Sequence, residues 1–152
     1  LFREACSDAG IQYLDPRDDV EQTMNRIATL DIVLAEAMHA AIVADALRVP
    51  WIAVCSAFRP HTFKWTDWCE SMGLTFRPVS IPNLSRVVNR FGLASPGPVQ
   101  RLALKIMRSR LRKLARSGRG QLSENSIHRA RLKAVREAMS EFHSDFERGK
   151  LD

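Results

Sequence analysis

Short apolar runs alternate with amphipathic stretches through the first half of the chain. The runs have strand length and are rich in β-branched residues, and they lie at residues 11–14, 30–34, 51–55 and 74–78. Helical periodicity fills the intervals, at residues 1–9, 18–29, 38–48 and 64–72. Strands that alternate with helices are typical of a parallel sheet covered on both faces. We therefore predict a three-layer α/β core over residues 10–81, with all four strands parallel.

Local signals mark the ends of these elements. Gly10 closes the first helix, and Asp18 followed three residues later by Glu21 resembles a capping box. Pro50 disfavours helical geometry at Val49, so the third helix stops before the strand at residues 51–55.

From Asn83 onward the pattern becomes helical. Helices are expected at about residues 84–91, 99–116 and 123–148, and Ser123 is a suitable N-cap for the last one. That last helix carries an apolar stripe at alternating spacings of three and four residues, made of Leu132, Val135, Met139, Phe142 and Phe146. Such a stripe is expected to pack against another part of the protein.

These patterns divide the chain into two parts. Residues 1–82 are predicted to form a Rossmann-like α/β core, and residues 83–152 a helical extension that packs on the core or on a missing N-terminal domain. The chain begins with Leu1 inside a helical pattern, so we expect a piece of a longer protein. Its longest apolar stretch is far below the ~20 residues that cross a bilayer. Three cysteines without a CxxC pair indicate no metal site and fit the reducing cytoplasm.

Charge is distributed unevenly along the chain. The net charge is +6, yet residues 1–60 hold 5 basic and 9 acidic side chains, whereas residues 61–152 hold 18 and 8. Between Arg86 and Arg119 the chain has ten basic residues and no acid. This region is expected to attract an anionic partner.

Candidate chemistry falls where two predicted strands end. Glu36, Met38 and His39 link the strand at residues 30–34 to the next helix. Three nitrogen-bearing side chains follow the next strand, and they are Arg59, His61 and Lys64. Ligands of open α/β sheets gather at the carboxyl ends of strands, where helix N-termini favour anions. The same residues also fit a solvated loop and a polar first helical turn, and spacing alone leaves the function open.

A resemblance to a known family favours an enzyme. The stretch AEAMHAAIVADALRVPWIAV (Ala35 to Val54), followed by RPHTFKWTDWCESMGL (Arg59 to Leu74), is similar to the C-terminal half of the polysaccharide pyruvyl transferase family. The likeness is greatest to ketal-forming enzymes of bacterial exopolysaccharides of the succinoglycan type, and it fades in the basic helices. Two positions depart from the family pattern, which often has Arg at Ala37 and Gly at Ala40.

The resemblance implies a cytoplasmic enzyme with two Rossmann-like domains, arranged as in GT-B glycosyltransferases, of which this chain supplies the C-terminal half. Its reaction moves pyruvate from phosphoenolpyruvate onto two sugar hydroxyls and uses no cofactor. His39 matches the family's histidine, and Met38 matches the apolar residue before it. We expect His39 to act as general acid/base or phosphate ligand, with Glu36 as its orienting partner or an acceptor ligand. Arg59, His61 and Lys64 are expected to hold the anionic donor.

The helix at residues 99–116 carries a cationic stripe formed by Arg101, Lys105, Arg108, Arg112 and Arg116. We expect the stripe to face solvent as a continuous strip and to bind a lipid-linked oligosaccharide acceptor or the inner face of the membrane. A solvated outer face explains the same stripe. Nucleic acid is disfavoured, because residues 101–119 include no aromatic side chain for base stacking.

Two other functions remain open from the sequence. A GT-B-type glycosyltransferase half-domain would share the sheet and bind a nucleotide-sugar diphosphate at the same edge. A non-catalytic basic module that binds anionic membrane or nucleic acid would not need His39.

Overall fold

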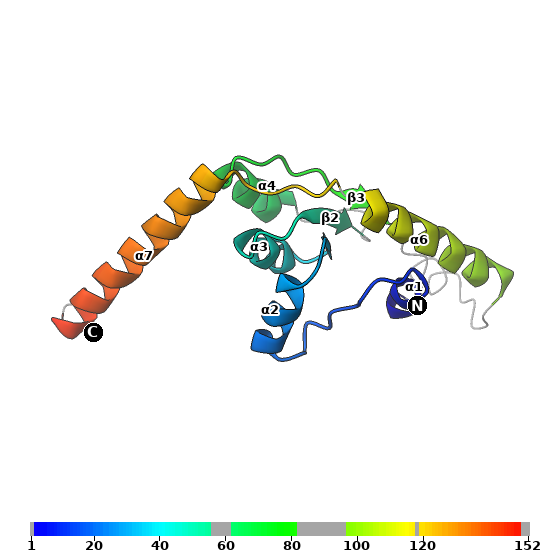
Figure 1. Ribbon diagram of the computed structural model, residues 1–152, viewed down its shortest axis with the longest axis horizontal. Helices are drawn as coiled ribbons and strands as arrows, with labels where there is room; N and C mark the ends of the chain where they lie inside the picture. Colours follow the sequence, from blue (N-terminus) through cyan, green and yellow to red (C-terminus); the bar gives the residue numbers. More distant parts are fainter. Residues whose placement is uncertain (1, 56–61, 82–96, 118, 150–152) are drawn as a thin grey trace.

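The computed structural model describes residues 2–55, 62–81, 97–117 and 119–149, and its ribbon is shown in Figure 1. Along the chain the elements are α1 (Phe2–Asp8), α2 (Val20–Ala28), β1 (Val33–Ala35), α3 (Met38–Ala46), β2 (Trp51–Cys55), α4 (Thr62–Ser71), β3 (Val79–Ser80), α6 (Pro98–Ser117) and α7 (Asn125–Glu147). The strand and helix alternation expected from the sequence is therefore present. The expected helix at residues 84–91 lies outside the described residues.

A parallel sheet of three strands, in the order β1-β2-β3, forms the centre of the described structure. Val33 is in register with Trp51, and Cys55 is in register with Ser80. Trp51 also exchanges two backbone hydrogen bonds with Gln121, which fixes the segment between α6 and α7 beside the start of β2. The parallel direction predicted from the sequence is confirmed.

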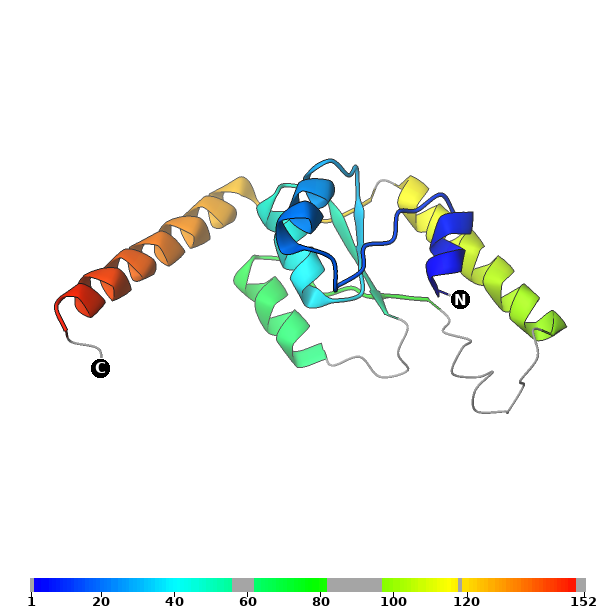
Figure 2. The ribbon, with the colours of Figure 1, turned by 90° about the horizontal axis from the view of Figure 1, so that it is seen from below.

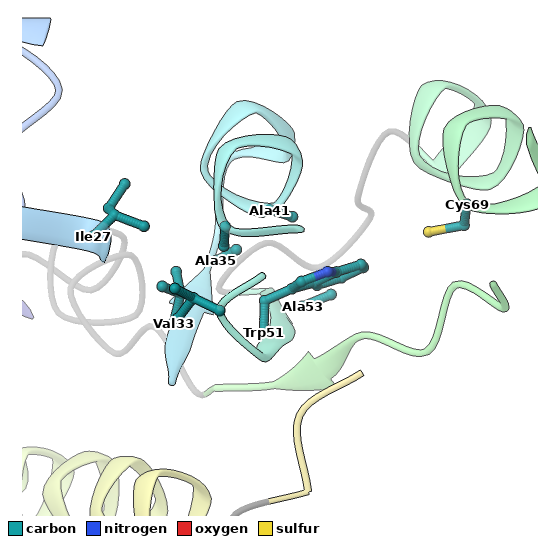
Figure 3. Packing of buried hydrophobic residues seen from close by; sticks show 9 residues of the cluster. Ile27, Val33, Ala35, Ala41, Trp51, Ala53 and Cys69 are labelled. Atoms are coloured by element: carbon teal, nitrogen blue, oxygen red, sulfur yellow. The ribbon is translucent and has the colours of Figure 1, made fainter. Parts of the chain in front are cut away.

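Alternate residues of the strands face two separate cores, because successive side chains of a strand point to opposite sides. On one face Val33, Ala35, Trp51 and Ala53 pack with buried side chains of α2, α3 and α4 (Figure 3). On the other face Ile52 and Val54 join a cluster that includes residues of α1 and α6. Helices thus cover both faces of the sheet, as predicted for a three-layer α/β arrangement.

Aromatic rings fill the core beneath α4. The ring centroid of the fully buried Trp51 lies 5.3 Å from that of Trp68 and 6.1 Å from that of Trp65. Phe76 stacks on Trp65 at 5.1 Å. The tryptophans therefore belong to the core, where tilted and offset contacts of this kind are favourable.

Helix α6 covers the second face through Met107 and Leu111, each 1% exposed. These side chains pack with Ala5 and Cys6 of α1, so α1 and α6 lie side by side (Figure 2). At its edges, Arg112 donates to the Asp8 carbonyl at 2.8 Å and Arg110 to the Ser80 carbonyl at 2.9 Å. Helix α6 is therefore part of the α/β body.

A buried carboxylate, Asp45 of α3, joins the body to the segment that leads into α7. It accepts hydrogen bonds from the Ser123 backbone N–H at 2.8 Å, from the Ser123 hydroxyl and from Trp51 Nε1 at 3.3 Å. Arg48, which has a left-handed φ of 61°, donates to the Ser123 hydroxyl and carbonyl. A buried charge is tolerated when it is paired and hydrogen-bonded in this way.

Helix α7 projects away from the body (Figures 1 and 2). Near its start, Ile127 lies against Gly73, and Arg131 Nε donates to the Ser71 carbonyl at 3.1 Å. A side chain at Gly73 would collide with Ile127, and the φ of 67° at this glycine also favours the absence of a Cβ. The predicted apolar stripe of α7 is exposed in the described structure, from 42% at Leu132 to 67% at Met139, so the expected packing is not seen there.

Three of the four predicted strands are wrong or displaced. Residues 11–14 form no strand. The backbone N–H of Ile11 donates to the Cys6 carbonyl, because this residue completes the C-terminal turn of α1. Residues 74–78 are also irregular, and pairing with β2 starts only at Val79, directly after Pro78, which has no N–H to donate. The strand expected at 30–34 is shorter and later, at Val33–Ala35.

Two predicted caps are also wrong. The N-cap of α2 is Asp19 and not Asp18, and its side chain accepts from the Gln22 N–H. Ser123 does not cap α7, because its hydroxyl is donated to the buried Asp45 and the helix starts later, after Glu124. Within the described residues, no helix is both long enough and apolar enough to span a membrane.

A candidate active site at the carboxyl edge of the sheet

Two of the predicted catalytic residues lie where β1 passes into α3. Buried Ala35 ends the strand, Glu36 follows it, and His39 occupies the first turn of the helix. The cap residue Ala37 is extended and gives the helix no side-chain hydrogen bond. The first-turn amides and the positive end of the helix dipole are therefore positioned for an anion at this edge.

The side chains at this junction differ in exposure. Glu36 and His39 are exposed, whereas Met38 is half-buried. An exposed imidazole beside a helix N-terminus can exchange protons with a bound molecule.

Lys64 lies in the first turn of α4, where it is exposed. Figure 2 shows that the first turns of α3 and α4 and the carboxyl ends of β1 and β2 lie at the same end of the sheet. Glu36, His39 and Lys64 thus belong to segments at the same end of the sheet, where β1 and β2 finish. Arg59 and His61 lie outside the described residues.

This edge combines the groups that an anionic substrate needs. A helix N-terminus and a lysine can hold phosphate or carboxylate, a histidine can move a proton, and a carboxylate can accept a hydrogen bond from a hydroxyl. In the described ranges, His, Cys, Asp and Glu do not gather in a group that could hold a metal ion.

The cationic stripe of α6 is only partly as predicted. Arg101, Lys105, Arg112 and Arg116 are exposed, but Arg108 is half-buried and its guanidinium lies 3.8 Å from the Asp8 carboxylate. Arg112 additionally donates to the Asp8 carbonyl. Arg108 still lines the same surface groove as Lys105, Arg112 and Arg116, and its ion pair with Asp8 forms because α1 packs beside α6.

Sequence analysis missed the network around Asp45, which joins residues 78 positions apart. The sequence feature that could have indicated this network is Asp45 itself, the single acidic residue of the apolar helix α3. Nearby, burial and the charge of Asp45 raise the pKa of the Cys69 thiol to about 11. Burial likewise raises the pKa of Cys6. Both thiols are therefore protonated near neutral pH and unsuited to nucleophilic catalysis.

The fold and this edge define a parallel α/β protein with a candidate anion site at the carboxyl ends of its strands. The chain is similar to the succinoglycan biosynthesis protein ExoV of Rhizobium meliloti (strain 1021), with 40% identity over 86 residues. The match covers 57% of this chain and 27% of that protein, so the chain spans about a quarter of its relative. No family model and no solved structure matches the chain.

Proposed function

We propose that the chain is part of a transferase of exopolysaccharide biosynthesis that moves pyruvate from phosphoenolpyruvate to sugar hydroxyls as a ketal. The observation that carries this proposal is the 40% identity to a succinoglycan biosynthesis protein. Within exopolysaccharide biosynthesis, the resemblance of residues 35–74 to pyruvyl transferases favours pyruvate transfer as the reaction. In the proposal, the chain supplies the C-terminal, Rossmann-like half of a GT-B-like enzyme, and the acceptor is a lipid-linked oligosaccharide met on the cytoplasmic side.

The reaction requires proton transfers that suit the edge of the sheet. Two sugar hydroxyls add to C2 of phosphoenolpyruvate, the C2–O bond to phosphate breaks, and the methylene carbon gains a proton to become a methyl group. One of the two hydroxyl protons is thus accounted for by the new methyl group, and the other leaves with the released phosphate. His39, exposed in the first turn of α3, is the proposed general acid/base, because histidine is the side chain that most readily both donates and accepts a proton near neutral pH.

The other groups of the edge hold the two reactants. Phosphoenolpyruvate carries a phosphate and a carboxylate, which Lys64 and the first-turn amides of α3 are proposed to bind, together with Arg59 and His61. Glu36, which follows β1, is proposed to accept a hydrogen bond from the acceptor hydroxyl or to orient His39. Met38, which lies between Glu36 and His39 in sequence, is proposed to contact the substrate.

The test compares two histidine variants in the complete enzyme that contains this chain. His39→Gln is expected to lower acceptor-dependent phosphate release from phosphoenolpyruvate by about 10²–10⁴-fold, the usual contribution of a general acid/base. His143→Gln is the matched control, because His143 is an exposed histidine of α7 far along the chain from this edge. Its activity is expected to equal that of the wild type.

Equal activity of His39→Gln and wild type would remove His39 from the mechanism. If the wild type releases no phosphate from phosphoenolpyruvate but transfers sugar from a nucleotide-sugar, the enzyme is a glycosyltransferase and the proposal is wrong.

A further inference from the structure

The outer face of α6 gathers cations that the core does not use. The helix carries seven basic residues and no acid over Pro98–Ser117. Met107 and Leu111 point into the core, so the opposite side of the helix is directed outward. There a shallow groove is lined by Lys105, Arg108, Ser109, Arg112, Lys113 and Arg116.

Two apolar side chains lie among these cations on the same outward side. Leu102 is 58% exposed and Ile106 is 41% exposed, although α6 offers a buried face elsewhere. They are four residues apart and therefore neighbours on the helix surface, next to Lys105 and Ser109. An amphipathic core helix needs no large apolar residue at these positions.

The protein itself neutralises little of this charge. In the described structure, Asp8 faces Arg108 at 3.8 Å, and Arg110 and Arg112 are occupied by backbone carbonyls. Lys105, Lys113 and Arg116 extend from the outward side as exposed like charges. Like charges three or four residues apart repel each other, so an anion on this face lowers their free energy.

The chemistry favours a membrane over a nucleic acid. Exposed cations flanking exposed aliphatic side chains fit a bilayer surface, where phosphate headgroups lie directly above acyl chains. Single-stranded nucleic acid is bound through aromatic rings that stack on bases, and residues 101–117 contain none.

We infer that the outer face of α6 is a docking surface for an anionic lipid bilayer. Lys105, Arg112, Lys113 and Arg116 contact the headgroup phosphates, and Leu102 and Ile106 enter the acyl boundary. The surface does not depend on the reaction proposed above, because its residues lie on a different element from His39.

The experiment measures sedimentation of the protein with vesicles made of equal parts phosphatidylglycerol and phosphatidylcholine, and with pure phosphatidylcholine vesicles. A variant with Gln at Lys105, Arg112, Lys113 and Arg116 is expected to lose about two to three orders of magnitude in partitioning to anionic vesicles, since each cation contributes roughly fivefold. The charge-matched control carries Gln at Arg77, Arg129, Lys133 and Arg136, which are exposed on other segments. It is expected to bind like the wild type.

A second variant, Leu102→Gln with Ile106→Gln, is expected to weaken binding about tenfold while keeping its salt dependence. Circular dichroism checks that each variant retains its helix content. Equal binding by the α6 variant and the control would overturn the inference, because net charge alone would then explain attraction. Tighter binding to a mixed-sequence oligonucleotide than to anionic vesicles would assign the face to nucleic acid instead.

Discussion

Helices α6 and α7 both follow the sheet in sequence, and both carry apolar side chains at helical spacing, although α6 has seven basic residues and no acid whereas α7 has four of each. Their surroundings differ. Met107 and Leu111 of α6 are almost completely buried against α1 and the sheet, whereas no residue of α7 is buried in the described structure. Helix α7 nevertheless exposes more large apolar side chains than α6 does, and two of them are phenylalanines, Phe142 and Phe146.

The comparison shows that periodicity predicts a helix and its apolar side but not what that side meets. Burial contributes roughly 25 cal/mol per Å² of apolar surface removed from water, so the same pattern stabilises the body in α6 and adds little to it in α7. Helix α7 is held at its start by the connection through Ser123, by Ile127 and by Arg131.

The largest effect is expected for Leu111→Ala in α6. Removing most of a fully buried leucine should lower the free energy of unfolding by about 2–5 kcal/mol, because the neighbours fill the cavity only partly. Urea unfolding followed by tryptophan fluorescence reports this directly, since all three tryptophans lie in the body. A loss as small as that at an exposed position would mean that α6 is not packed on the sheet.

An effect of comparable size is expected for Asp45→Ala. The change leaves the indole N–H of Trp51 and the backbone N–H of Ser123 without their acceptor, at about 1–3 kcal/mol for each buried donor. The exposed Asp31→Ala is the control and should be nearly neutral. A selective shift of the Trp51 indole resonance should accompany the loss, and an unchanged resonance would contradict the hydrogen bond.

The smallest effect is expected for Phe142→Gln in α7. Phe142 is 64% exposed, so the free energy of unfolding of the body should change by no more than about 0.5 kcal/mol. The same urea titration measures it beside Leu111→Ala. A loss comparable to that of Leu111→Ala would show that the α7 stripe is packed in solution, and the contrast between the two helices would fail.

Much of the α/β body could be predicted from local patterns. The strand at Trp51–Cys55 is buried on both sides, so its continuous apolar run and the preceding Pro50 located it correctly. The position of Glu36 and His39 at the link between β1 and α3 was predictable for the same reason, because a buried strand followed by a helix fixes the end of the sheet at which the link lies; their roles stay a prediction.

The wrong predictions depend on distant partners. Ile11 and Tyr13 are packed against the core formed with α1 and α6, yet their segment lacks a strand neighbour and remains irregular. Ser123 fits a local cap rule, but its hydroxyl is bound by Asp45, which only the folded chain brings near. The spacing on α6 likewise does not reveal that α1 places Asp8 beside Arg108.

The proposed activity of the protein that contains this chain is the formation of a pyruvate ketal. The most direct measurement supplies phosphoenolpyruvate labelled with carbon-13 at C2, together with a succinoglycan-type oligosaccharide acceptor, and follows the labelled carbon by NMR. We expect the label to move from the enol carbon to a ketal carbon joined to two sugar oxygens, in the wild type and in His143→Gln but not in His39→Gln. Label that stays in phosphoenolpyruvate, or that appears only as free pyruvate, would contradict it.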